Sequence, residues 1–254
     1  MDKRIKEFFG NQPVMFIKFS DNIDNLISLQ QGNLYMNNLK FFVDLEEKTG
    51  IPGMGDKLET LNVINDVELS FYIPGTEQLV AKTKARKANF RYEDALYKPV
   101  FCLFAVTVDM LEIYEESETE VKLKINFTND LINKMRSEFG THALVISPPH
   151  FSEQLEKSFN QNGYDYSGRF VEYIDTNINQ QRRLEAFANQ DISLFFFKDH
   201  GFKHQNEFRI VILNKDEEKA IIENIGSLTE GSILLKTEDL INFDLPVLNM
   251  KFKE

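Results

Sequence analysis

The segment QNEFRIVIL places two opposite charges inside a run of apolar residues. In a strand, Glu207 and Arg209 share one face while Phe208 and Ile210 share the other. Burying a charge is costly unless it is paired, so the two side chains either brace a polar interior or line a cleft. Lys198 lies just upstream. Such a pair more often stabilises the interior, whereas a pair that lines a cleft could take part in binding or catalysis.

A second set of polar residues lies in the first quarter of the chain. Lys18 closes an apolar stretch, Tyr35 sits in a short extended segment, and Asp56 and Glu59 follow a glycine-rich loop. Glycine lets a backbone approach a ligand closely, but neither the dinucleotide fingerprint nor the Walker spacing is present. The loop is therefore either a surface connection, which is the commoner case, or a phosphate-binding loop.

Basic residues gather between positions 82 and 98, interleaved with aromatic ones. Lys82, Lys84 and Arg86 alternate, so in a strand they share one face, where a phosphate or an acidic partner could dock. The alternative is an edge strand protected by its charges. The formal net charge of -11 opposes binding to a phosphate backbone, so we do not expect duplex nucleic acid as a partner.

Metal and nucleophile chemistry have weak support. His200 and His204 stand four residues apart, but Gly201 disfavours a helix and no HExxH glutamate is present. Ser147 lacks the glycines of a nucleophile elbow, and Cys102 lies among apolar residues. A single cysteine excludes an intramolecular disulfide and zinc sites built from several thiolates. We expect no metal and a reducing, cytoplasmic location.

Hydrophobic patterning predicts the elements that must position these residues. Short apolar runs predict strands, and capped amphipathic runs predict helices, the first of them capped by Ser20 or Asp21 and a later one by Thr128. The predicted strands are 14–19, 33–37, 99–108, 142–147, 171–173 and 206–213, with closing strands near 219–224, 232–236 and 245–252. The predicted helices are 21–30, 39–48, 129–138, 148–160 and 180–188.

Three segments are harder to assign. Residues 61–90 predict paired strands, with turns at Asn65-Asp66 and Pro74-Gly75. The acidic stretch 112–120 is interpreted as a solvated connection. Residues 191–199 fit a helix or a buried strand, with a preference for the helix.

These elements predict an α+β fold, in which helices pack on a mixed, mostly antiparallel sheet. A chain of 254 residues can bury a large core without staples, and its 23 phenylalanines indicate an aromatic-rich one. We expect a single α+β domain over residues 1–254, or two tightly packed lobes. No segment is long and apolar enough to predict export or membrane insertion.

Parts of the chain resemble known proteins. The stretches FIKFSDNIDNLISLQQGNLYMNNLKFF, GDKLE and FFFKDHGFKHQNEFRIVI resemble a loosely defined set of uncharacterised phage and Gram-positive bacterial proteins, some linked to abortive infection. A looser similarity is to ADP-ribosyltransferase-like folds. That similarity implies an NAD cleft in which Glu207 is the catalytic glutamate and Tyr35 stacks on nicotinamide. Lys18 departs from it, because such enzymes usually show histidine or arginine there.

The first functional hypothesis is a protein of phage–host conflict that binds NAD or another nucleotide, as an ADP-ribosyltransferase-like enzyme if it is catalytic. Glu207 would stabilise a developing oxocarbenium. The expected substrate-binding residues are Lys18, Tyr35, Lys198 and Arg209, with Lys198 or Arg209 pairing with the pyrophosphate.

The alternative hypothesis is a non-catalytic module that binds a bacterial or phage protein, such as a defence or housekeeping protein that it inhibits. It would use an acidic surface or a phenylalanine-rich face. Acidity is spread over both halves of the chain, and its densest patch is formed by Glu112, Glu115, Glu116, Glu118 and Glu120.

Overall fold

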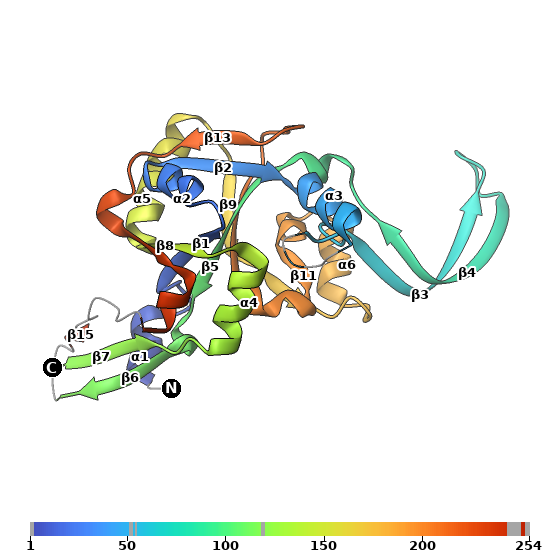
Figure 1. Cartoon of the computed structure of the whole chain (residues 1–254). Coiled ribbons are helices and arrows are strands. Elements are labelled where there is room, and N and C mark those ends of the chain that lie inside the picture. The colour runs from blue at the N-terminus through green and yellow to red at the C-terminus, as the bar shows by residue number, and fades with distance from the viewer. Residues whose placement is uncertain (1–2, 51–52, 54, 118–119, 243–249, 252–254) are drawn as a thin grey trace.

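An eight-stranded antiparallel sheet forms the centre of the protein (Figure 1). A computed structural model describes residues 3–50, 53, 55–117, 120–242 and 250–251. The strand order is β13-β2-β5-β1-β8-β14, with β12 paired to β5 and β9 paired to β12. The strands are β1 (Met15–Ser20), β2 (Asn33–Asn38), β5 (Pro99–Val106), β8 (His142–Ile146), β9 (Tyr166–Phe170), β12 (Glu207–Ile212), β13 (Ile221–Asn224) and β14 (Ser232–Lys236).

Helices cover both faces of this sheet. On one face α2 (Ile23–Gln30) and α5 (Pro148–Gln161) bury leucine and phenylalanine side chains against the strands. On the other face α4 (Asn129–Phe139) and α3 (Leu39–Thr49) cover two separate clusters. The predicted α+β class, with its mostly antiparallel sheet, is confirmed.

The helix starts follow from side-chain caps. Thr128 Oγ1 accepts a hydrogen bond from Leu131 N at 3.2 Å, as predicted. The prediction for α2 is wrong by one or two residues, because Asn22 Oδ1 accepts from Asp24 N at 2.9 Å. The carboxylate of Asp21 instead accepts from Thr141 N at 3.1 Å and joins the start of α2 to β8.

Smaller elements surround the sheet. They include the helices α1 (Lys3–Phe9) and α6 (Gln181–Ala188) and the strand pairs β3 (Asn62–Tyr72) with β4 (Leu79–Phe90), β6 (Leu111–Glu116) with β7 (Glu120–Ile125), and β10 (Glu172–Ile174) with β11 (Phe197–Asp199). Strand β15 (Met250–Lys251) pairs with β7. The 3-10 helices are η1 (Asp94–Tyr97), η2 (Val108–Met110), η3 (Ile192–Phe196), η4 (His200–Gln205), η5 (Thr229–Gly231) and η6 (Thr237–Asn242).

Two predicted connections are in fact strands. No chain reversal occurs at Asn65-Asp66, because β3 continues through it, although Asp66 adopts a φ of 50°. The turn at Pro74-Gly75 is confirmed. Of the acidic stretch 112–120, residues 112–116 lie in β6 and Glu120 begins β7. Ile113 alternates with the glutamates and packs against the cluster that contains Ile5.

The remaining differences are local. Residues 191–199 combine both predicted options, η3 followed by strand β11. Of the strand predicted at 171–173, Glu172 and Tyr173 lie in β10, and Val171 lies between β9 and β10. Of the predicted closing strand 245–252, only Met250–Lys251 lies within the described residues. Among the described residues, no helix is long and apolar enough to cross a membrane.

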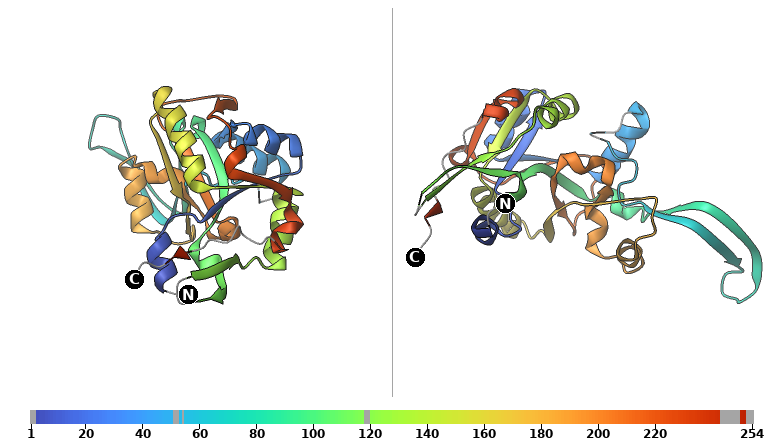
Figure 2. Two further views of the ribbon diagram at one scale, coloured as in Figure 1. Left: turned by 90° about the vertical axis from the view of Figure 1, so that its left-hand side faces the viewer. Right: turned by 90° about the horizontal axis from the view of Figure 1, so that it is seen from below.

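Strands β3 and β4 project far from the rest of the molecule as a two-stranded arm, here called the β3–β4 arm (residues 62–90; Figure 2). Its base contacts α6, where Arg183 Nη2 donates to the carbonyl of Val63. Lys82 and Lys84 lie 3.7 and 3.9 Å from the carboxylate of Glu68 on the neighbouring strand. The basic row predicted here is therefore a strand face, partly neutralised by one glutamate.

Candidate functional site

The pairing of β12 with β5 sets the direction of the charged side chains. Arg209 lies opposite Cys102, and Glu207 lies opposite Phe104. Because side chains alternate along a strand, Glu207, Arg209 and Cys102 all point to the face that is covered by α3 and η3. Phe208 points to the other face, where its ring lies 5.0 Å from that of Phe16.

Arg209 joins two acidic side chains. Its Nε donates to Glu207 Oε1 at 2.7 Å, and its Nη1 and Nη2 donate to the carboxylate of Glu59 at 2.8 and 2.6 Å. Nη1 also donates to the carbonyl of Phe195 at 2.8 Å. A two-pronged contact of this kind fixes the orientation of both planar groups.

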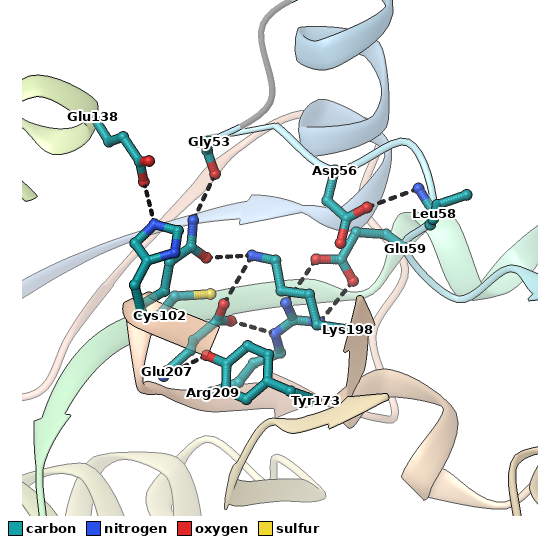
Figure 3. A network of polar contacts seen from close by, with 12 residues as sticks. Gly53, Asp56, Leu58, Glu59, Cys102, Glu138, Tyr173, Lys198, Glu207 and Arg209 are labelled. Atoms are coloured by element: carbon teal, nitrogen blue, oxygen red, sulfur yellow. Dashed lines mark hydrogen bonds and ion pairs between the residues drawn. The ribbon is translucent and has the colours of Figure 1, made fainter. Parts of the chain in front are cut away.

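Lys198 completes the cluster from strand β11. Its Nζ donates to Glu207 Oε2 at 3.1 Å and to Gln205 Oε1 at 2.7 Å (Figure 3). Gln205 Nε2 in turn donates to the carbonyl of Gly53, at 2.8 Å. The hydroxyl of Tyr173 accepts from Glu207 N at 2.9 Å. Glu207 therefore has both carboxylate oxygens and its backbone N–H engaged.

These four charges are sealed in the interior. The exposed fractions are 1% for Arg209, 2% for Glu59, 5% for Glu207 and 7% for Lys198. Burial alone would raise the pKa of Glu207, but Arg209 and Lys198 outweigh it and hold that pKa below its usual range. The pair predicted at 207 and 209 is thus closed by Glu59 instead of opening into a hollow.

The loop after α3 carries two acidic residues, Asp56 and Glu59. Gly55 packs so closely on α3 that a Cβ there would lie 2.5 Å from Glu46 N. Asp56 follows it and is 1% exposed. Its Oδ1 accepts from Leu58 N at 2.8 Å, while its Oδ2 has no hydrogen-bond partner among the described residues. Burial, reinforced by the nearby charge of Glu59, raises the pKa of Asp56 to about 7.

The thiol of Cys102 is a poor nucleophile. Burial, together with the carboxylate of Glu207, raises the pKa of its thiol to about 12, so the nucleophilic thiolate is scarce at neutral pH. The same strand accepts a hydrogen bond from another predicted site residue. Lys18 Nζ donates to the carbonyl of Cys102 at 2.7 Å.

Lys18 and Tyr35 do not join the Glu207 cluster. Ile17 lies opposite Phe104, which places Lys18 on the other face of the sheet from Glu207. Its ammonium lies 4.6 Å from the ring centroid of Phe101. Tyr35 is 58% exposed on β2, where it pairs with Ile222 of β13. Of the five predicted site residues, the structure brings together Glu207, Lys198 and Arg209.

A recess open to solvent adjoins this cluster; about 350 Å³ of space lies between its walls when open solvent is included, and about 20 Å³ of it can be reached by a water-sized molecule. We call it the Arg183 recess. Lys198 belongs both to the buried cluster and to the recess wall, whereas Glu207 does not line it. The lining residues are Leu58, Thr60, Leu61, Asn62, Ile174, Thr176, Arg183, Leu194, Phe197, Lys198 and Asp199.

Arg183, on α6, is the unusual residue of the recess. It is 2% exposed, and its Nη2 donates to the carbonyls of Val63 and Ile178. Its Nε and Nη1 have no hydrogen-bond partner, and no carboxylate forms an ion pair with it among the described residues. Burial lowers the pKa of the guanidinium. Asn62 Oδ1, an acceptor in the same lining, is also without a partner there.

Sequence reasoning missed this arginine. Helix 180–188 was predicted, but Arg183 was not singled out as a site residue. The available signal is that Arg183 precedes Ala186 and Phe187 by three and four residues and therefore shares the helix face that packs inward. Its neighbour Arg182 is 71% exposed at the side chain and pairs with Glu172 at 2.7 Å.

Residues of the other predicted clusters contact oppositely charged or hydrogen-bonding side chains. His204 Nε2 lies 2.7 Å from Glu138 Oε2 and joins η4 to α4. No group of three or more potential metal ligands is found in the described residues. In the acidic patch, Glu115 lies 2.6 Å from Lys122, and Glu112 lies 3.6 Å from Lys124.

Comparison of the chain with protein-family models, curated proteins and solved structures finds no match. The function of the protein is therefore inferred from the geometry of the site.

Proposed function

We propose that the protein binds a small anionic ligand of the nucleotide class, with a phosphate group held by Arg183. The observation that carries this proposal is the pair of unpartnered donors on Arg183, in a side chain that is 2% exposed and lines a recess. A buried guanidinium without a counter-ion is costly, and a phosphate oxygen satisfies such a group with charge-assisted hydrogen bonds.

The rest of the lining suits the non-phosphate part of a nucleotide. The carboxamide oxygen of Asn62 can accept from a ribose hydroxyl or from a base amino group. Ile174, Leu194 and Phe197 offer apolar surface next to it. Ligand sites typically combine apolar walls with a few polar groups in this way.

In this proposal the buried cluster supports the recess. Lys198 forms part of the recess wall, and its ammonium is held by Glu207 and Gln205. Glu207 is then a positioning residue, since both of its carboxylate oxygens are occupied by Arg209 and Lys198. NAD remains a candidate ligand, and the proposal includes no transfer of ADP-ribose.

The proposal is tested by thermal unfolding with NAD, ADP, AMP and inorganic phosphate. A ligand that binds only the folded state raises the unfolding temperature in a concentration-dependent way. We expect a rise with at least one nucleotide in the wild type and its loss in Arg183→Gln. Arg182→Gln, which changes the adjacent exposed arginine, should keep the rise. Equal responses of the two variants, or no response in the wild type, would contradict the proposal.

A further inference from the structure

The β3–β4 arm is a two-stranded sheet, so each of its strands has one edge that its partner strand does not pair (Figures 1 and 2). Backbone N–H and C=O groups along such an edge can pair with a strand of another chain. Two strands alone are marginally stable in water, and a third strand adds hydrogen bonds and packing. The two edges of the arm differ in what covers them and in their charge.

The edge of β3 is occupied at the base of the arm. Asn179 Oδ1 accepts from Asn65 N at 2.7 Å, and Asn179 Nδ2 donates to the carbonyl of Asn65 at 2.8 Å. This side-chain amide therefore takes the place of a neighbouring strand. Two residues earlier, the carbonyl of Val63 accepts from Arg183 Nη2. Next to Asn65, Asp66 has a φ of 50°, which makes this edge irregular.

The edge of β4 is open over most of its length. Its pairing with β3 keeps one register from Ala81 to Phe90, and every residue from Ser70 to Lys84 is exposed. Among the described residues, β4 forms strand pairs with β3 alone. An extended segment can therefore lie along the outer edge of β4 without displacing a strand of the protein.

Charge determines which kind of segment fits this edge. Strand β4 has no acidic residue, and its basic residues are Lys82, Lys84, Arg86 and Lys87. Because side chains alternate along a strand, the first three share one face, here called the basic arm row. Glu68 of β3 lies 3.7 Å from Lys82 and 3.9 Å from Lys84, and all three side chains are more than half exposed. No ion pair to Arg86 is found in the described part of the chain.

The other face of β4 carries no charge. Its residues Ala81, Thr83 and Ala85 lie opposite Phe71, Leu69 and Val67 of β3, in that order. A third strand beside β4 would therefore place alternate side chains next to this uncharged face and the remaining side chains next to the basic arm row. Acidic residues suit the second set of positions, and apolar residues suit the first.

We propose that the open edge of β4 binds an extended acidic segment of another protein, in which acidic and apolar residues alternate, as a third strand of the arm. Backbone hydrogen bonds along the edge supply affinity, and the basic arm row selects acidic side chains. The proposal does not depend on the ligand proposed for the Arg183 recess, because the two surfaces share no residue.

The acidic body of the protein lies too far away to cancel this selection. Lys84 lies opposite Glu68, which is six residues along β3 from Asn62, or about 20 Å at the rise of a strand. Exposed charges at that separation are largely screened at physiological salt, where the Debye length is about 8 Å. The arm itself has four basic and three acidic residues in a chain of net charge -11.

The first test is amide hydrogen exchange by NMR with a seven-residue peptide that alternates glutamate with valine and is blocked at both ends. In the free protein, every second backbone N–H of β4 faces the open edge and exchanges readily. We expect the peptide to slow exchange at these alternate amides between Ala81 and Ala88 and to leave the amides of the central strand β5 unchanged. Binding that leaves the alternate amides of β4 fast would overturn the strand pairing.

The second test reverses the charge of the basic arm row. The double variant Lys84→Glu with Arg86→Glu should bind the same peptide at least about tenfold more weakly, because two attractive cross-strand pairs become repulsive. The control double variant Lys157→Glu with Lys219→Glu makes the same charge change at exposed positions of the body and should keep wild-type affinity. Circular dichroism checks that both variants fold. Equal weakening in the two double variants would overturn the assignment to the arm.

The third test compares ligands on the wild type. A peptide of the same composition, with its glutamates and valines in separate blocks, should bind more weakly because it cannot match both faces of β4. Equal affinity for the two peptides, or no binding of the alternating one, overturns the proposal. A single-stranded oligothymidylate that binds more tightly than the alternating peptide would assign the basic arm row to phosphate groups and overturn it as well.

Discussion

Arg209 and Glu59, 150 positions apart in sequence, form a two-pronged ion pair that joins the central strand β12 to the loop after α3. The side chains are 1% and 2% exposed, so the contact lies in the interior. Glu59 therefore occupies the position beside Arg209 where the sequence pattern allowed a cleft. It also holds the segment that leads into Asn62 and the wall of the Arg183 recess.

Removing the guanidinium of Arg209 should strongly destabilise the fold. Arg209→Met leaves Glu59 and Glu207 as buried acids with too little positive charge, which typically costs about 3–5 kcal/mol of unfolding free energy. Denaturant unfolding measures this loss. Arg169→Met, on the neighbouring strand position but exposed, should change the free energy by only about 0.5 kcal/mol. Similar losses in both variants would show that the buried cluster is not what stabilises this region.

Asp56 should make the protein less stable as pH rises toward neutrality. Its folded pKa of about 7 exceeds the ordinary value of 3.8, so the folded state binds more protons in between. Stability from this group is therefore greatest at acid pH and falls until the pH passes the folded pKa, by up to about 4 kcal/mol in total. Measurement from about pH 5 to about pH 8 stays clear of the opposite effect of Glu207 at lower pH.

The matched variants are Asp56→Asn and Asp66→Asn. Asn at position 56 keeps the side-chain shape without the charge, so the variant should gain stability at neutral pH and show a shallower pH dependence. Asp66 is exposed on the arm, and its replacement should leave the slope unchanged. A wild type whose stability is flat over this range would exclude the protonated carboxyl.

Cys102 should resist alkylation in the native protein. Its thiol pKa of about 12 leaves little of the nucleophilic thiolate at neutral pH, although the side chain is only partly buried. Mass spectrometry after iodoacetamide treatment should show almost no adduct without denaturant and complete modification when the chain is unfolded. The chain has one cysteine, so the adduct reports this site alone. Rapid labelling of the folded protein would contradict the raised pKa of this thiol.

Local signals predicted much of the fold. The cap at Thr128, the apolar run of β5 and the alternation in QNEFRIVIL each depend on neighbouring residues, and each predicted element is present. The acidic hairpin β6–β7 was missed because its glutamates conceal the alternating Leu111 and Ile113. The many glutamates favoured a solvated connection, although the apolar residues alternate as in a strand.

The site depended on contacts that sequence spacing does not encode. Glu207 and Arg209 were recognised because they are two residues apart. Their partner Glu59 was noted only as part of a loop, since nothing local links it to β12. Arg183 is informative because two of its donors have no hydrogen-bond partner among the described residues, and that absence becomes visible only when the folded neighbourhood is known.

The central claim is that the free donors of Arg183 hold a phosphate group. The most direct measurement is a high-resolution structure of crystals grown with the nucleotide that gives the largest thermal shift. The account predicts phosphate oxygens within hydrogen-bond distance of Arg183 Nε and Nη1, at about 2.7–2.9 Å. An ordered water that bridges Arg183 to Asn62, with the nucleotide absent from the recess or bound elsewhere, would contradict it.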